Sequence, residues 1–509
     1  MRWSAAIAAA VVAISLAARI SLLLSRPLWH DERFTAWISR RPPGEIVAAL
    51  RRDSGPPVFY LIERASKAAS APASRAWVLR LVSFAAALLL LPILLGSLPR
   101  RARAMGAVLV SCFALINLYA AEARAYALLA LLGFLVFRMS QGGRESPARL
   151  AGLAVVAAIA LYTHYLALFV VVAAAVAALA ARRFLSAAAC AAALAAFAPW
   201  LPILAAQPTA ALAWLHEPPL ATFEGFASAL GGVGRIPLPF GASPPVALVG
   251  AAAVLGLLLT AGATAAVARR ELEIRGALVF VLLVLGLAFA ASVVRPLAFA
   301  GRSEMAALPV WVWALARASE ESRALRRGAW AAAVLGMAAT LFVVFSPHRK
   351  DTPAAAVRRL GGMTRSGDAV IAGPYFYLAA RLAADRGDLP GSVQALPSGD
   401  ADHPGWFVAR LPGEEEEREI SLRMDALPAD RRLFLLLPPS HQTPGVMRTL
   451  FSRGTVREIV RQPDAVLLVW SASATPSSLS SSPTRRTNRM RSPPVTRHSV
   501  AITNDQIGL

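Results

Sequence analysis

Long runs of apolar residues alternate with short polar loops over the first 346 positions of the chain. A helix needs about 20 mainly apolar residues to cross a bilayer. The runs therefore predict about eleven transmembrane helices, at 5–25, 76–98, 104–121, 126–138, 150–164, 166–181, 184–205, 244–268, 276–294, 304–319 and 328–346. The first run lacks a small-residue cleavage site, so we expect it to be retained as a span.

Arginine residues gather in alternate loops between these runs. They fall at Arg2, Arg100 to Arg103, Arg138 to Arg149, Arg182-Arg183, Arg269 to Arg275 and Arg317 to Arg327. Cytoplasmic loops of membrane proteins carry an excess of Arg and Lys. This pattern predicts a multi-pass protein of the cytoplasmic (inner) membrane, with its N-terminus in the cytoplasm and its C-terminal region outside.

The composition changes after residue 346, where Asp, Glu, Gly and Pro become more frequent and long apolar runs stop. Two short apolar segments, 369–372 and 433–437, are typical of buried strands, and 375–385 has a helical pattern. We therefore expect a small extracytoplasmic α/β domain over 347–470. The last segment, 471–509, is rich in Ser, Thr, Pro and Arg, which predicts disorder.

Composition and charge narrow the class of protein further. The chain is 57% apolar and 16% charged, whereas a soluble domain carries roughly a quarter charged residues. A net charge of +22 can indicate a nucleic-acid-binding protein, but most arginines lie beside apolar runs, where membrane topology explains them. We expect no nucleic-acid partner. Cys112 and Cys190 lie within apolar segments, with no spacing typical of a disulfide framework or a metal site.

Unusual polar residues lie on the predicted outer side of the membrane. Asp31 and Glu32 follow the first apolar run, and an acidic side chain that faced lipid there would be costly. We therefore expect both carboxylates to face a protein-lined or watery cavity. Six further residues map to the same side and predict an active site there: Glu122, Arg124, Tyr126, His164, Tyr165 and Arg302.

Several short motifs resemble those of a known enzyme family. They are Trp29-His30-Asp31-Glu32, Asp53 to Leu61 with its Gly55-Pro56-Pro57 turn, Tyr119 to Tyr126, Leu161 to Tyr165, and Pro199-Trp200-Leu201-Pro202. In this order and on one side of the membrane, they resemble the GT-C membrane glycosyltransferases of the family 39 type. That type includes protein O-mannosyltransferases and lipid A aminoarabinose transferases, and the resemblance covers about 1–320.

The resemblance implies a fold and a reaction. The fold is an all-α polytopic membrane domain, followed here by the small α/β domain. The reaction transfers a sugar from a polyprenyl-phosphate donor to a hydroxyl of a lipid, glycan or protein acceptor, with inversion, on the outer face of the membrane. Asp31 matches the position of the general base or acceptor-orienting group; the alternative is a helix-end carboxylate that pairs with Arg33.

For the other acidic residues the resemblance leaves two interpretations each. Glu32 either contacts substrate or a metal ion in catalysis, or forms a structural ion pair. Asp53 either lines the cavity or caps the Gly-Pro-Pro turn. Glu122 either contacts substrate or pairs with Arg124 in the cavity wall.

The basic and aromatic residues have similar alternatives. Arg124 and Arg302 are expected to bind the donor phosphate, because the guanidinium fork suits phosphate oxygens, although Arg302 could instead anchor a helix end by snorkelling. Tyr126, His164 and Tyr165 are candidates for substrate binding. His164-Tyr165 and His216-Glu217 are also possible contacts of a divalent metal ion, without the dense spacing of a dedicated metal site.

Two rival functions remain open at the level of sequence. A transporter or lipid flippase would also collect charges in a cavity, but it predicts broken helices or inverted repeats. A non-catalytic subunit of a cell-envelope assembly would use the C-terminal domain for binding, and it would not require Asp31, Glu32 and Arg302 together.

Overall fold

The structure is a computed structural model. It describes residues 2–66, 73–207, 218–236, 244–267, 272–294, 299–346, 352–404, 413–428, 430–439, 443–462 and 465–472. The predicted disordered segment 471–509 lies outside the described residues except for Ser471 and Ala472, which belong to the last strand.

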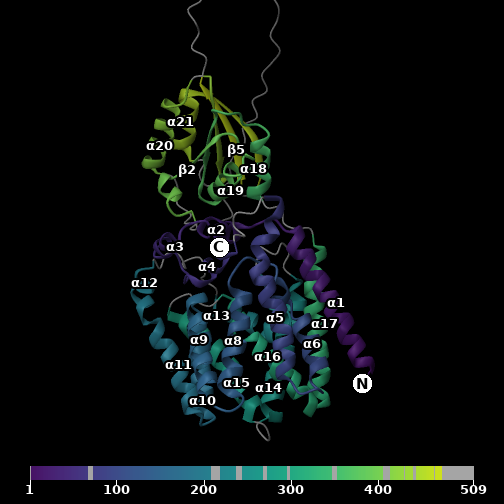
Figure 1. Cartoon of the computed structure of the whole chain (residues 1–509). Coiled ribbons are helices and arrows are strands. Elements are labelled where there is room, and N and C mark those ends of the chain that lie inside the picture. The colour runs from purple at the N-terminus through teal and green to yellow at the C-terminus, as the bar shows by residue number, and fades with distance from the viewer. Residues whose placement is uncertain are drawn as a thin grey trace, which may run out of the picture. The chain divides into compact units, whose positions relative to one another are not determined.

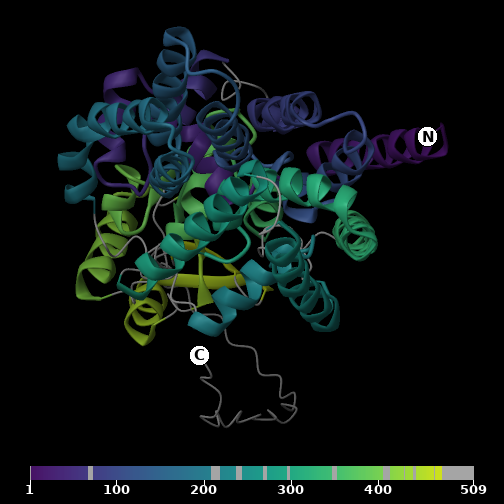
Figure 2. The same cartoon turned by 90° about the horizontal axis from the view of Figure 1, so that it is seen from below.

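The apolar part of the chain is helical (Figures 1 and 2). Its helices are α1 (Arg2–Ser25), α5 (Leu81–Ser97), α6 (Arg103–Cys112), α7 (Ala114–Tyr119), α8 (Tyr126–Gln141), α9 (Pro147–Thr163), α10 (Ala167–Ala180), α11 (Phe184–Phe197), α12 (Leu201–Ala206), α13 (Pro219–Leu230), α14 (Val246–Val267), α15 (Leu272–Val294), α16 (Leu308–Glu321) and α17 (Arg323–Phe345). A helix occurs at each predicted span, and α13 is an additional helix that the sequence did not predict.

Six of the described helical segments are long and apolar enough to cross a membrane. They are Ala5–Ser25, Trp77–Ser97, Phe184–Ala206, Val246–Ala265, Ile274–Val293 and Arg323–Phe345. Large apolar side chains such as Ile14, Phe184 and Val254 are exposed on these helices. An apolar outer surface of this extent suits lipid rather than water, so the predicted multi-pass helical fold is confirmed.

The predicted span at 104–121 is divided into two helices. Helix α6 ends at Cys112, and α7 begins at Ala114, whose backbone N–H donates to the carbonyl of Gly232 at 2.9 Å. A Cβ atom at Gly336 of α17 would lie 2.6 Å from the carbonyl oxygens of Cys112 and Gly232. Glycine at 336 therefore allows three backbones to meet at the break, as small residues do in membrane helix packing.

The first loop forms three short helices and a 3-10 helix before α5. They are α2 (His30–Ile38), α3 (Pro43–Leu50), α4 (Val58–Ala65) and η2 (Ala73–Arg80). The predicted helical stretch from Pro43 is α3. Pro43 stands in its first turn, where proline lacks only an N–H that would have no helical partner.

The C-terminal part contains a five-stranded sheet with strand order β2-β1-β3-β5-β4 (Figure 1). The strands are β1 (Ala369–Ala372), β2 (Ser392–Ala395), β3 (Arg432–Leu437), β4 (Gly454–Gln462) and β5 (Ala465–Ala472). The strand β1 pairs in parallel with β2 and β3, while β5 pairs antiparallel with β3 and β4. The sequence predicted β1 and β3 but not the other three strands.

Successive side chains along a strand point to opposite faces of the sheet. Both faces of this sheet are buried. One face, with Val370 and Phe434, packs in a cluster with α18 (Thr352–Gly361) and α19 (Pro374–Ala384). The other face, with Ile371 and Leu435, packs in a cluster with α20 (Glu414–Asp425) and α21 (Pro444–Arg453). The α/β fold that the sequence predicted for this part of the chain is therefore present, and the predicted helix at 375–385 is α19.

Candidate active site

Helix α2 carries both acidic residues of the pair. Asp31 and Glu32 lie in its first turn, where negative charge is favoured by the helix dipole. The Glu32 carboxylate also accepts a hydrogen bond from the backbone N–H of Trp29 at 3.3 Å, which caps the helix start. Adjacent residues on a helix point about 100° apart, so the two carboxylates reach different surroundings.

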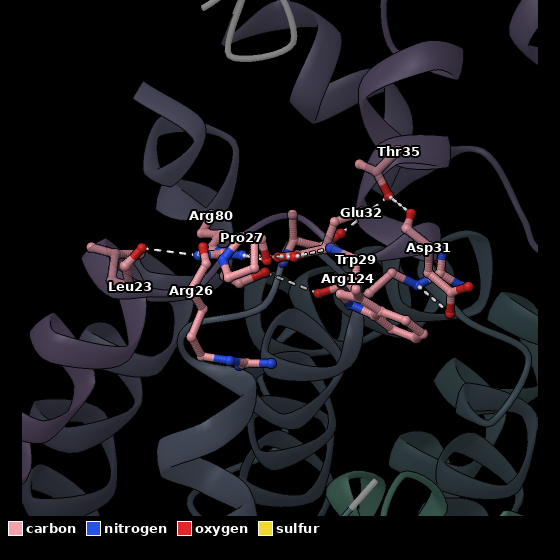
Figure 3. Close-up of polar contacts among 11 residues, drawn as sticks. Leu23, Arg26, Pro27, Trp29, Asp31, Glu32, Thr35, Arg80 and Arg124 are labelled. Carbon is pink, nitrogen blue, oxygen red and sulfur yellow. Dashed lines mark hydrogen bonds and ion pairs between the residues drawn. The ribbon is translucent and has the colours of Figure 1, made fainter. Parts of the chain in front are cut away.

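Glu32 forms a closed, buried ion pair with Arg80. Its two carboxylate oxygens accept from Nε and Nη2 of Arg80 at 2.6 and 2.7 Å, and both side chains are 1% exposed. The Arg80 guanidinium also donates to the carbonyls of Leu23, Arg26 and Pro27 (Figure 3). Burial opposes ionisation of Glu32, but Arg80 holds the pKa of this carboxyl below its usual range. These contacts favour the structural ion pair over a substrate contact for Glu32.

Asp31 has a different environment. Its Oδ2 lies 3.6 Å from Nη1 of Arg302 and 4.0 Å from Nε of Arg124. The side chains of Asp31, Arg302 and Arg124 are 24%, 10% and 21% exposed. Figure 3 shows Asp31 directed toward Arg124, away from the Glu32–Arg80 pair. The structure therefore brings together three of the predicted site residues in an arrangement that solvent can reach.

Arg302 is held in place by its own loop. Gly301 before it has a φ of +89°, a left-handed conformation that favours glycine. The Gly301 N–H donates to both carboxylate oxygens of Glu304 at 2.9 Å, and its carbonyl accepts from the Tyr119 hydroxyl at 2.6 Å. The Arg302 guanidinium lies 5.3, 5.8 and 5.0 Å from the ring centroids of Trp29, Tyr126 and Phe299, within cation–π range.

Arg124 is positioned from the first loop. Its Nη1 donates to the Tyr60 hydroxyl at 3.3 Å, and its carbonyl accepts from the hydroxyl of Ser83 at 2.9 Å. Burial, together with the nearby carboxylates of Asp53 and Asp31, raises the pKa of Tyr60 against the opposing effect of Arg124. Asp53, which is 9% exposed, is thus electrostatically coupled to the same group of residues.

Glu122 is buried at the edge of this group. Neither carboxylate oxygen has a hydrogen-bond partner among the described residues, and the pair with Arg124 that the sequence left open is not formed. Burial raises the pKa of Glu122 to about 7, although the positive charge of Arg302 acts in the opposite direction. Glu122 can therefore change its protonation state near neutral pH.

His164 and Tyr165, two further predicted site residues, form hydrogen bonds with neighbouring residues of the protein. Nδ1 of His164 accepts from the N–H of Leu166 at 3.1 Å, and its ring packs 5.0 Å from that of Tyr126. The Tyr165 hydroxyl donates to Gln207 at 2.8 Å and accepts from the indole N–H of Trp200 at 3.0 Å. Gln207 in turn donates to the carbonyl of Leu50 at 2.7 Å, which connects this group to the loop before Asp53.

Four residues that were not predicted from the sequence also shape the site: Tyr60, Arg80, Tyr119 and Trp29. Tyr60, Tyr119 and Trp29 lie within the motifs quoted above, so their positions were available but their roles were not. Arg80 lies near the start of the predicted span 76–98, in a stretch with no recognisable motif. Its role as the partner of Glu32 depends on contacts between distant segments.

Metal ligation is a separate question. Within the described ranges, no group of three or more His, Cys, Asp or Glu side chains could hold a metal ion. His216 and Glu217, the second possible metal pair, lie outside the described residues.

The α/β domain contacts α2 directly. Helix α19 packs against α2 (Figure 1), and the ring of Tyr375 stacks on that of His30 with 5.5 Å between centroids. The ring of His403 lies 5.6 Å from that of Phe34, and Arg40 pairs with Asp385 at 3.4 Å. The helix that carries Asp31 is thus bounded by residues from the C-terminal domain.

Comparison with solved structures identifies the architecture. The chain is similar to ArnT from Cupriavidus metallidurans in the apo state, with a TM-score of 0.55 and 14% identity over 91% of this chain and 97% of that one. The chain has the GT-C fold. ArnT bound to undecaprenyl phosphate matches with a TM-score of 0.54 and 14% identity over the same shares. No family model and no curated protein sequence matches.

Proposed function

We propose that the protein is a membrane glycosyltransferase that moves a sugar from a polyprenyl-phosphate donor to an acceptor hydroxyl. The observation that carries this proposal is the position of Asp31 between Arg302 and Arg124. A single carboxylate beside two cations, partly open to solvent, provides the groups that such a transfer needs. The GT-C fold, shared with an ArnT structure that holds undecaprenyl phosphate, supports the donor class.

The reaction follows from these groups. The acceptor oxygen attacks the anomeric carbon from the side opposite the phosphate, so the configuration inverts. Asp31 accepts the proton of the hydroxyl as the new C–O bond forms. The bond between the anomeric carbon and the phosphate oxygen breaks, and polyprenyl phosphate leaves as an anion.

Arg302 and Arg124 stabilise the negative charge on the leaving phosphate. Guanidinium groups remain charged when partly buried and can donate two parallel hydrogen bonds to phosphate oxygens. The aromatic rings around Arg302 restrict its orientation, and a preorganised cation stabilises developing charge without a reorganisation cost. Glu122, Asp53, Tyr126, His164 and Tyr165 would line or support the sugar and acceptor sites.

We further propose that residues 1–346 carry the transferase and that 347–470 form its extracytoplasmic domain. The alternation of arginine-rich loops supports a cytoplasmic N-terminus in the inner membrane. The contacts of α19 with α2 then lie on the outer side, together with Asp31 and the site.

The test is a reaction of the purified full chain with a set of polyprenyl-phosphate sugars in lipid nanodiscs. We expect the reaction to release free polyprenyl phosphate and to form a glycosylated acceptor with inverted configuration. The amount of both products should increase with the concentration of the protein. In cells, loss of the protein should accumulate the lipid-linked donor and remove a surface glycan. Movement of intact lipid-linked sugar across the bilayer without its consumption would instead indicate a flippase.

A further inference from the structure

The distances between Asp31 and its two arginines are long for ion pairs. Charge-assisted hydrogen bonds from guanidinium to carboxylate measure about 2.7–2.9 Å, as the Arg80–Glu32 pair does at 2.6 and 2.7 Å. Asp31 lies at 3.6 Å from Arg302 and 4.0 Å from Arg124. Asp31 therefore faces both guanidiniums without a direct hydrogen bond to either.

Asp31 is shared by the two arginines. Two guanidiniums converge on one oxygen, Oδ2, from two loops that are distant in sequence. A second anion that binds these guanidiniums at hydrogen-bonding distance therefore takes the side that Asp31 faces. A phosphate group suits this role, because its oxygens match the guanidinium fork.

We infer that Asp31 and the donor phosphate compete for Arg302 and Arg124, so that the donor must bind before Asp31 can serve the acceptor. This inference rests on the proposed function. In the absence of donor, the carboxylate faces the arginines. When phosphate takes the arginines, its negative charge repels the carboxylate and makes it a stronger proton acceptor. The carboxylate is then available to the acceptor hydroxyl, and the order of binding is donor first.

The competition predicts an unusual result for a catalytic residue. Removal of the Asp31 charge should tighten the binding of the donor phosphate while it abolishes the base. Two unit charges about 4 Å apart interact appreciably even in water, and more strongly near a protein surface. We therefore expect Asp31→Asn to bind undecaprenyl phosphate more tightly by a factor on the order of ten.

The experiment measures equilibrium binding of undecaprenyl phosphate, which carries no sugar and cannot react, to the full chain in nanodiscs. The variants are wild type, Asp31→Asn, Asp31→Ala, Arg302→Ala and the control Asp385→Asn. Asp385 pairs with Arg40 and Arg381 at the surface, so the control removes the same charge elsewhere. Both Asp31 variants should bind more tightly, Arg302→Ala more weakly, and the control like wild type.

Each other outcome has a defined meaning. Equal or weaker binding by both Asp31 variants, with weaker binding by Arg302→Ala, would overturn the competition and leave the proposed function standing. Tightening by Asp385→Asn to the same extent would also overturn it, because the effect would be one of net charge. Binding that Arg302→Ala does not change would reject the phosphate site and the proposed function with it. Two substitutions at Asp31 keep the test valid if one variant fails to fold.

Discussion

Asp31 and Glu32 are adjacent, identically charged and part of the same helical turn, yet their environments differ completely. Glu32 is enclosed with Arg80, with a hydrogen bond at each oxygen and 1% exposure. Asp31 is partly open, and its two arginines are too distant for direct hydrogen bonds. A saturated carboxylate has no capacity left for substrate, whereas an unsaturated one does. The comparison favours a structural role for Glu32 and supports our proposal that Asp31 carries the chemistry.

The largest expected effect on folding is at the closed pair. Arg80→Leu leaves the Glu32 charge buried without its partner, which should lower the free energy of unfolding by about 3–5 kcal/mol. The double variant Arg80→Leu with Glu32→Leu should recover much of this loss, because no isolated charge remains. Thermal unfolding in detergent measures both.

The matched control for this prediction is an exposed bidentate pair in the C-terminal domain. Arg461 and Glu458 are 58% and 40% exposed and joined at 2.7 Å. Arg461→Leu should change the melting temperature little or not at all, because solvent-exposed ion pairs contribute little to stability. If Arg80→Leu lowers the stability as little as this control does, the distinction between a closed and an open ion pair is contradicted.

The next effect concerns the open cluster and leaves folding intact. Arg302→Ala should weaken donor binding by about 2–5 kcal/mol, as truncation of a buried charged partner does. Arg302→Lys keeps the charge but not the fork, so its loss should be intermediate. Titration with a polyprenyl-phosphate sugar measures the affinities. Wild-type affinity of the Arg302→Lys variant for the donor would support the alternative that Arg302 only anchors the end of a helix.

A smaller effect is expected at Tyr60, which sharpens the comparison by testing how Arg124 is held. Tyr60→Phe removes the hydroxyl that accepts from Arg124 at 3.3 Å and retains the ring. A net hydrogen bond contributes about 0.5–1.5 kcal/mol, so donor affinity should fall a few-fold with little change in the melting temperature. A large loss of stability with unchanged donor affinity would make Tyr60 a packing residue only.

A pH dependence of stability is expected at Glu63, a buried residue of α4. Its carboxylate oxygens have no hydrogen-bond partner among the described residues, and burial, with the nearby Glu32, raises its pKa to about 8. Because the pKa of Glu63 is raised in the folded state, its stabilisation of the fold is fully present at pH values below the unfolded-state pKa of about 4.3. This stabilisation is lost as the pH rises through the folded-state pKa of about 8.

Glu63→Gln removes this titration and keeps the shape. Between pH 6 and pH 9, which lie roughly two units below and one unit above that pKa, the melting temperature of this variant should fall less than that of the wild type. Glu45→Gln, at an exposed position, serves as the control and should retain the wild-type slope. Identical slopes for wild type and Glu63→Gln would show that Glu63 titrates normally in the folded protein.

Local patterns predicted much of the fold. Apolar runs located the membrane helices, and two β-rich segments located β1 and β3. The break at Phe113 was not predicted, because the apolar run continues through it and the break depends on the distant Gly232 and Gly336. The outer strand β4, which pairs only with β5, was missed because charged and apolar residues are mixed along it. The strand β5 is an apolar run that is visible in the sequence but was not predicted.

The site was predictable in its members but not in their division of labour. Asp31, Arg124 and Arg302 were selected as unusual charges on one side of the membrane, and the fold brings them together. The roles of Asp31 and Glu32 could not be separated, since that difference is set by Arg80, 48 positions away from Glu32. Neither the spacing of residues nor the composition of the sequence predicts such a contact.

The central claim is that Asp31, and not Glu32, acts on substrate. The direct measurement is sugar transfer by purified Asp31→Asn, which keeps the size of the side chain and removes the proton acceptor. Transfer should fall by roughly 10²-fold or more, the scale of general-base loss, while the melting temperature and membrane insertion remain those of wild type. Transfer at the wild-type rate by a folded Asp31→Asn protein would contradict the account.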